Sequence, residues 1–153
     1  MEALFRELAG QFRPPLGELD ITRGRGFANE DWLVITLRPR NQDSARIHVD
    51  VVTDEVVFGV GNHGCRIDLE INGGIDPQEV LQQTRQLAMA VITGGYSEVI
   101  KDIPIAGKYV EGILKVDQKT LRLGCGVPFG NLMPGRSTVI NYQPYDQPSS
   151  SGV

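Results

Sequence analysis

The fold of this chain is decided by residues 46–71, RIHVDVVTDEVVFGVGNHGCRIDLEI. Apolar and polar side chains alternate over Arg46–Val51 and again over Arg66–Ile71, with an apolar run at Glu55–Phe58 between them. A period of two residues is that of a β-strand, whose successive side chains point to opposite faces. Three such segments separated by short turns predict antiparallel strands joined as a meander.

Further strands are expected on both sides of this stretch, where β-branched and aromatic residues are enriched. The connections between them are expected at Arg23–Gly26, a loop with two cations, and in the segment that runs through Pro104 and Gly107. The other expected strands are Leu16–Thr22, Trp32–Arg38, Tyr109–Val116, Thr120–Gly126 and Ser137–Tyr142.

Two helices are predicted. The first is short and amphipathic, with an apolar repeat that begins at Leu4 and ends at Phe12, just before a proline pair. The second begins at Asp76-Pro77-Gln78-Glu79, where an N-cap acid precedes a proline in the first helical position. Its broad apolar stripe ends at Gly94, a natural C-terminal stop.

These elements predict an α+β fold in a single domain of residues 1–142. We expect a mostly antiparallel meander sheet, with a long central helix and a short N-terminal helix packed on one face. A chain of 153 residues can bury a core without metal or disulfides. Residues 143–153, QPYDQPSSSGV, are expected to form a disordered tail.

The charge is uneven along the chain. The net charge is −4, and residues 47–84 hold one basic residue against seven acidic ones, which sum to −6. Such a balance disfavours nucleic acid, since phosphate affinity needs clustered cations. This acidic field is either a solvated sheet face or the binding site for an electropositive protein. The residues that would contact this partner are Asp50, Asp54, Glu55, Asp68 and Glu70.

A literal G-x-G-x-x-G motif lies at Gly59–Gly64. Dinucleotide binding requires a helix after the third glycine, because the helix N-terminus receives the pyrophosphate. The residues that follow alternate as a strand does, so we interpret the motif as a glycine-rich strand connection. No cofactor is expected.

The same loop brings His63 close to Cys65 in the sequence, and these are residue types that form a thiol nucleophile and its base. A metal site could draw on both, together with His48 and Asp50, but structural zinc prefers paired ligands such as C-x-x-C. None is present, and no metal is expected. Cys125 is expected to be a small core residue.

The first residues carry acids and no apolar stretch of signal-peptide length, and no later run is long enough to cross a bilayer. A cytoplasmic location is therefore expected, with both cysteines as free thiols and no membrane contact.

The leading functional hypothesis is a non-enzymatic protein-binding module. It would act as an acidic immunity protein that neutralises a cognate toxin, or as a secretion chaperone. The alternative is a small enzyme or ligand-binding protein that uses the Gly59–Cys65 loop with its Cys/His pair. The strand Ser137–Tyr142 can also pair with a second copy of the chain, which would give a homodimer.

Overall fold

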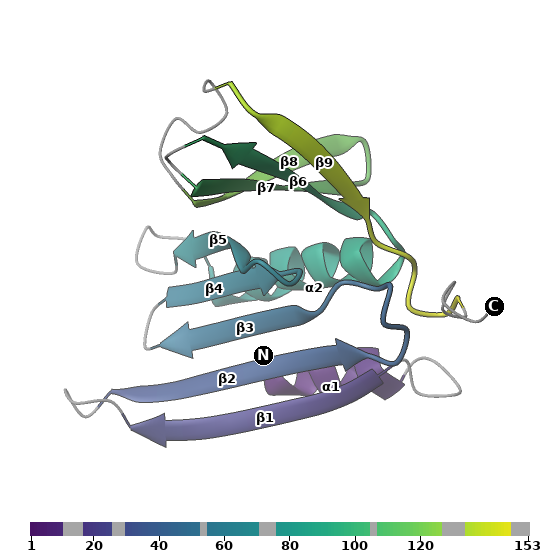
Figure 1. The fold of residues 1–153 in the computed structure, drawn as a ribbon. Helices are drawn as coiled ribbons and strands as arrows, with labels where there is room; N and C mark the ends of the chain where they lie inside the picture. Colours follow the sequence, from purple (N-terminus) through teal and green to yellow (C-terminus); the bar gives the residue numbers. More distant parts are fainter. Residues whose placement is uncertain are drawn as a thin grey trace.

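The computed structural model describes residues 1–10, 17–25, 30–52, 55–70, 76–104, 107–126 and 134–147. Over these residues the fold is α+β, with two helices and nine strands in two antiparallel sheets (Figure 1). The elements in chain order are α1 (Glu2–Gly10), β1 (Gly17–Arg25), β2 (Asp31–Pro39), β3 (Ile47–Val52), β4 (Glu55–Val60), β5 (Cys65–Glu70), α2 (Pro77–Ile92), β6 (Tyr96–Ile103), β7 (Gly107–Val116), β8 (Lys119–Gly126) and β9 (Arg136–Asn141).

The first sheet is the predicted meander, in the order β1-β2-β3-β4-β5. Its register aligns Ile35, Val49, Phe58 and Ile67 across four strands. The first three of these side chains have no exposed surface. Because side chains alternate along a strand, this row fixes one face of the sheet as the core face.

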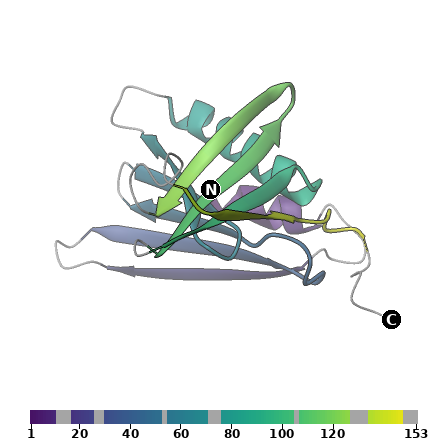
Figure 2. The ribbon, with the colours of Figure 1, turned by 45° about the horizontal axis from the view of Figure 1, so that its top comes forward.

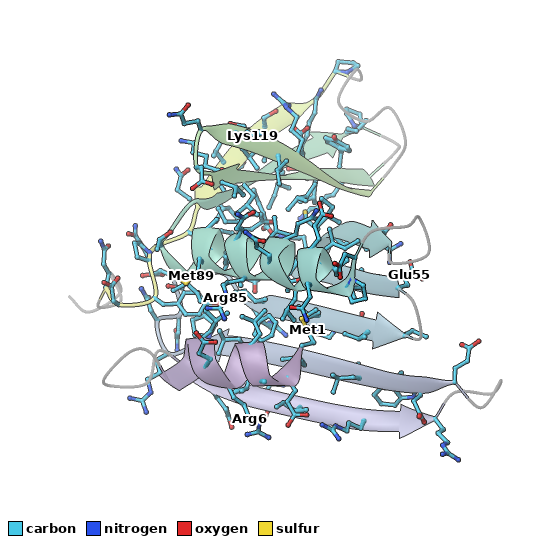
Figure 3. The ribbon with its side chains drawn as sticks, turned by 180° about the vertical axis from the view of Figure 1, so that it is seen from behind. Met1, Arg6, Glu55, Arg85, Met89 and Lys119 are labelled. Carbon is cyan, nitrogen blue, oxygen red and sulfur yellow. The ribbon has the colours of Figure 1, made fainter. Side chains whose placement is uncertain are left out.

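Both helices lie on that core face, which is turned toward the viewer in Figure 3. The apolar sides of α1 and α2 are buried there, as their periodicity predicts. Arg85 of α2 donates two hydrogen bonds to the carboxylate of Glu7 in α1, at 2.6 and 2.8 Å. The opposite face, here called the outer face, is covered by neither helix.

The second sheet has the order β8-β7-β6-β9 and lies beyond the β5 edge of the first (Figure 1). Strands β7 and β8 run obliquely to β1 and β2 (Figure 2). The hairpin of β7 and β8 and the edge strand β9 agree with the sequence-based prediction. Strand β6 lies where a connecting segment was expected, and it pairs with both β7 and β9.

The prediction of a loop at Arg23–Gly26 is wrong for Arg23–Arg25, because these residues continue β1 to the end of its pairing with β2. Both arginines have acidic partners in this extended conformation. Arg23 donates to the Glu2 carboxylate of α1, and Arg25 donates to Asp31 at 3.1 Å. Gly26 lies outside the described residues, as do Phe12 and Asp54.

Residues 143–147 are packed, so the expectation of a disordered tail is wrong for them. Tyr145 is only 4% exposed, and its backbone N–H donates to Ile92 at 2.9 Å. Its phenol donates to the carbonyl of Ala45. A large apolar ring with two such partners orders the segment. Residues 148–153 lie outside the described part of the chain.

Among the described residues, no helix has both the length and the apolar character needed to span a bilayer.

The N-cap of α2 gives a direct stability test. The Asp76 side chain accepts from the Gln78 N–H at 2.9 Å, as the sequence predicts. We expect Asp76→Ala to lower the free energy of unfolding by about 1 kcal/mol, because one terminal N–H loses its acceptor. Asp76→Asn, which keeps a capping oxygen, should retain most of the stability. Urea denaturation measures both, and equal losses in the two variants would contradict the assignment.

Candidate functional site

Pairing across strands β3 to β5 places the predicted acidic positions on the outer face, except Asp54, which lies outside the described residues. The register aligns Asp50, Val57 and Asp68 in one row, and Glu55 with Glu70 in the next. Asp68 and Glu55 are exposed, and Asp50 is half-buried. Acidic side chains therefore gather at the end of the outer face where β3 ends and β4 begins.

A small apolar patch adjoins these acids. It consists of Trp32, Val34, Val52 and Val57, and we call it the Trp32 patch. Trp32 lies opposite Val52 across β2 and β3, and Val52 is 37% exposed. The indole also lies over Gly24 of β1, where a Cβ would fall 2.3 Å from Trp32 Cζ2. The glycine thus makes room for the largest side chain on this face.

The other end of the outer face is basic, which the charge sum along the sequence did not reveal. Arg66 shares a row with His48, on either side of Gly59. Both Arg46 and Arg66 are exposed and line one pocket. The acidic field therefore covers only half of the face over β3 to β5, and the sheet carries charges of opposite sign at its two ends.

His48 is engaged on both ring nitrogens. Its Nε2 lies 2.9 Å from a carboxylate oxygen of Asp50, and its Nδ1 lies 3.0 Å from the hydroxyl of Thr36. Since a carboxylate only accepts, Nε2 donates the proton to Asp50. These contacts fix the ring on the outer face beside the pocket.

The G-x-G-x-x-G stretch is a strand connection, as the sequence-based interpretation holds. Gly59 belongs to β4, residues 61–64 form a four-residue turn, and strand β5 follows at Cys65. Gly61 and Gly64 have φ values of +79° and +69°, a region that favours glycine. No helix N-terminus is available here to receive a pyrophosphate.

The turn directs His63 to a buried carboxylate. Its Nδ1 lies 2.7 Å from Oε2 of Glu98, a β6 residue with no exposed surface. The phenol of Tyr142 donates to the same oxygen at 2.8 Å, and that of Tyr96 donates to Oε1 at 3.0 Å. The two phenol rings stack with centroids 5.4 Å apart. We call these four residues the Glu98 cluster.

Two glycines leave space for the Glu98 cluster. A Cβ on Gly61 would lie 1.9 Å from Glu98 Oε1, and one on Gly112 of β7 would lie 2.8 Å from the Tyr96 hydroxyl. Neither position can hold a larger residue without displacing the buried network. The glycine in the middle of the motif therefore serves a packing role.

The tyrosines of the cluster remain hydrogen-bond donors over a wide pH range. Burial is the main cause that raises the pKa of Tyr96 above its ordinary value of 10, and the Glu98 carboxylate adds to it. The pKa of Tyr142 is raised by burial and by its hydrogen bond to Glu98. Burial alone raises the pKa of Tyr145.

The expectation of free thiols is wrong for Cys65. This residue is disulfide-bonded and has no exposed surface. The only other cysteine of the chain is Cys125, in strand β8. A buried sulfur that is already bonded offers no thiolate, so it cannot serve as the nucleophile of a Cys/His pair. His63 is instead oriented by Glu98.

Sequence reasoning recognised His63 but not its partner. Glu98 is 35 residues away in a strand that was not predicted, and Tyr142 is 44 residues beyond Glu98. Catalytic sites in which histidine is the general base also use a carboxylate to orient the imidazole. Here the carboxylate accepts from two further phenols in the core, and that arrangement fastens the turn to the second sheet.

Among the described residues, no three His, Cys, Asp or Glu side chains gather as a group that would hold a metal ion. No protein-family model, curated protein or solved structure matches the chain.

The Glu98 cluster predicts a large stability effect. Glu98→Ala would leave three donors without their acceptor, and we expect a loss of about 3 kcal/mol or more in the free energy of unfolding. Tyr142→Phe removes a single bond to the carboxylate and should cost about 1.5 kcal/mol. Tyr109→Phe, at a half-exposed position, is the control and should change stability by less than about 0.5 kcal/mol. Chemical denaturation that ranks these variants otherwise would contradict the role of Glu98.

The raised tyrosine pKa values predict alkaline unfolding. Tyr96, Tyr142 and Tyr145 stay protonated in the fold, whereas the unfolded chain ionises them near pH 10. Unfolding above pH 10 therefore releases protons. The free energy of unfolding should fall by up to about 1.4 kcal/mol per pH unit for each such tyrosine, from its full value below pH 10.

Phenolate absorbance measures this directly. The chain has four tyrosines. Partial burial and the Glu111 carboxylate raise the pKa of Tyr109 too, but this half-exposed phenol should ionise before the other three, while the protein is still folded. The other three should ionise together with the loss of circular dichroism. Ionisation of all four before any unfolding would show that the three phenols are not protected.

Proposed function

We propose that this chain is a protein-binding module and that the outer face of the five-stranded sheet is its binding surface. The Trp32 patch, with Glu55 and Asp68 exposed beside it on a face that neither helix covers, is the observation that carries the proposal. Protein interfaces commonly combine an apolar centre with a polar rim, and tryptophan is enriched among their energetically dominant residues.

The acidic rim favours an electropositive partner. Glu55 and Asp68 have no salt-bridge partner among the described residues, so their charges are available to steer an approaching basic surface. A toxin with a basic active site would meet this demand, as in the inhibition by an immunity protein. A basic client segment of a secretion chaperone would meet it equally, and both uses need the same face.

A non-enzymatic role agrees with the state of Cys65. The alternative hypothesis of an enzyme rested on a thiol next to His63, and the disulfide removes that thiol. The imidazole of His63 is committed to Glu98 through Nδ1. We therefore do not propose thiol-based catalysis.

The test is affinity capture from extracts of the source cells with matched variants. We expect the wild-type chain to retain one stoichiometric basic partner that is released as salt rises. Trp32→Ala should weaken its binding by about 30-fold, which corresponds to about 2 kcal/mol for a central interface residue. Glu55→Lys with Asp68→Lys should mainly slow association.

The control carries Asp102→Lys with Asp146→Lys, which changes the net charge equally at exposed positions outside the five-stranded sheet. It should bind as the wild type does. If the partner binds the Trp32 and Glu55/Asp68 variants as strongly as it binds the control, the outer face is not the binding surface. Purified partner and surface plasmon resonance give the rates.

A further inference from the structure

The basic end of the outer face contains a pocket whose two arginines the proposed function does not use. It has a volume of about 300 Å³, which is within the range of small-molecule sites. Strands β3, β4 and β5 and the turn at 61–64 form its walls. The polar side chains of its walls that matter here are Arg46, His48, Asp50 and Arg66.

The guanidinium groups of Arg46 and Arg66 have no acidic or hydrogen-bonding partner among the described residues. Most described arginines differ in this respect, and Arg38, for example, lies 2.8 Å from Asp20. A guanidinium presents several N–H donors in a planar fork that matches the oxygens of a carboxylate or a phosphate. Two unpaired forks that line one pocket are thus a recognition element for an oxyanion.

Glycines keep the floor of the pocket open. Gly59 lies between His48 and Arg66 in the register and adds no side chain there. Gly64 has open space where a Cβ would be, with no atom within 4 Å. A small anion can therefore approach the backbone closely, which is a common use of glycine at anion sites.

The one carboxylate of the pocket is already compensated. Asp50 accepts from His48 Nε2, so its nearest oxygen faces a donor and not the open space beside the arginines. The side chains of the pocket then sum to one net positive charge with His48 neutral, in a chain whose net charge is −4. A local field of opposite sign to that of the whole molecule attracts anions to this point.

We propose that the pocket lined by Arg46 and Arg66 binds an oxyanion group, the phosphate or carboxylate of a small molecule. The two arginines supply charge and paired donors, and the glycine floor supplies access. The site adjoins the acidic end, because Asp50 and Val57 line the pocket too, but its anion-binding groups are Arg46 and Arg66, which the protein-binding proposal does not use. Its test is therefore independent of the protein-binding proposal.

The experiment is a titration of the labelled protein with inorganic phosphate and with acetate, followed by amide resonances of Gly59, Gly61 and Gly64. Sodium chloride at matched ionic strength is the reference. We expect saturable shifts of these glycine resonances with phosphate, acetate or both. The anion that binds more tightly identifies whether the site prefers a phosphate or a carboxylate group. Shifts that do not saturate, or that chloride reproduces, would overturn the proposal.

Matched variants locate the site. Arg46→Gln and Arg66→Gln should each weaken binding at least 10-fold while leaving the fold intact, because both side chains are exposed. Arg122→Gln is the control, since Arg122 pairs with Glu111 on the second sheet and should leave binding unchanged. Equal affinity in all three variants would place the anion elsewhere and overturn the assignment. Affinity capture of the protein partner with the Arg66→Gln variant tests the protein-binding proposal separately, because this variant leaves Glu55 and Asp68 unchanged.

Discussion

A carboxylate without access to water needs donors for its oxygens, and the fold supplies Glu98 with three. These donors come from its own strand, from the turn between β4 and β5, and from the segment after β9. The two sheets and the C-terminal segment therefore share one buried acceptor. Gly61 and Gly112 are glycines because the network occupies the space where their side chains would be. The position of the turn, and with it the shape of the nearby pocket, depends on this interaction.

The four-residue turn belongs to two environments at once. Its His63 reaches into the Glu98 cluster, whereas Gly61, Asn62 and Gly64 line the pocket on the outer face. A short glycine-rich turn can do both because positive φ values let neighbouring residues diverge. The literal G-x-G-x-x-G spacing thus reflects backbone geometry and close packing, and its likeness to a nucleotide-binding motif is a coincidence of short patterns.

The meander, the capped helix α2 and the hairpin of β7 and β8 follow from local signals, namely alternation, an N-cap and turn residues. Strand β6 escaped prediction because Glu98 occupies an inward position, where a binary pattern expects an apolar residue. The Glu98 cluster was harder still to predict from the sequence, since Glu98, His63 and Tyr142 meet only through tertiary structure. The charge sum over residues 47–84 included Arg66 but not Arg46, although the sheet places both around one pocket. Strand alternation did place Asp50 and Asp68 on a common face correctly.

The packing of residues 142–145 has a consequence for the order of folding. The pairs of the first sheet join neighbouring strands, so their loops are short and close at little entropic cost. The Tyr145 phenol and the Ser44 hydroxyl, in contrast, make hydrogen bonds that span 100 residues. During synthesis the meander and α2 can assemble while the second sheet is still being made. Closure around Glu98 must then wait for Tyr142, which follows the last strand, so the third donor to this carboxylate is the last one to be synthesised.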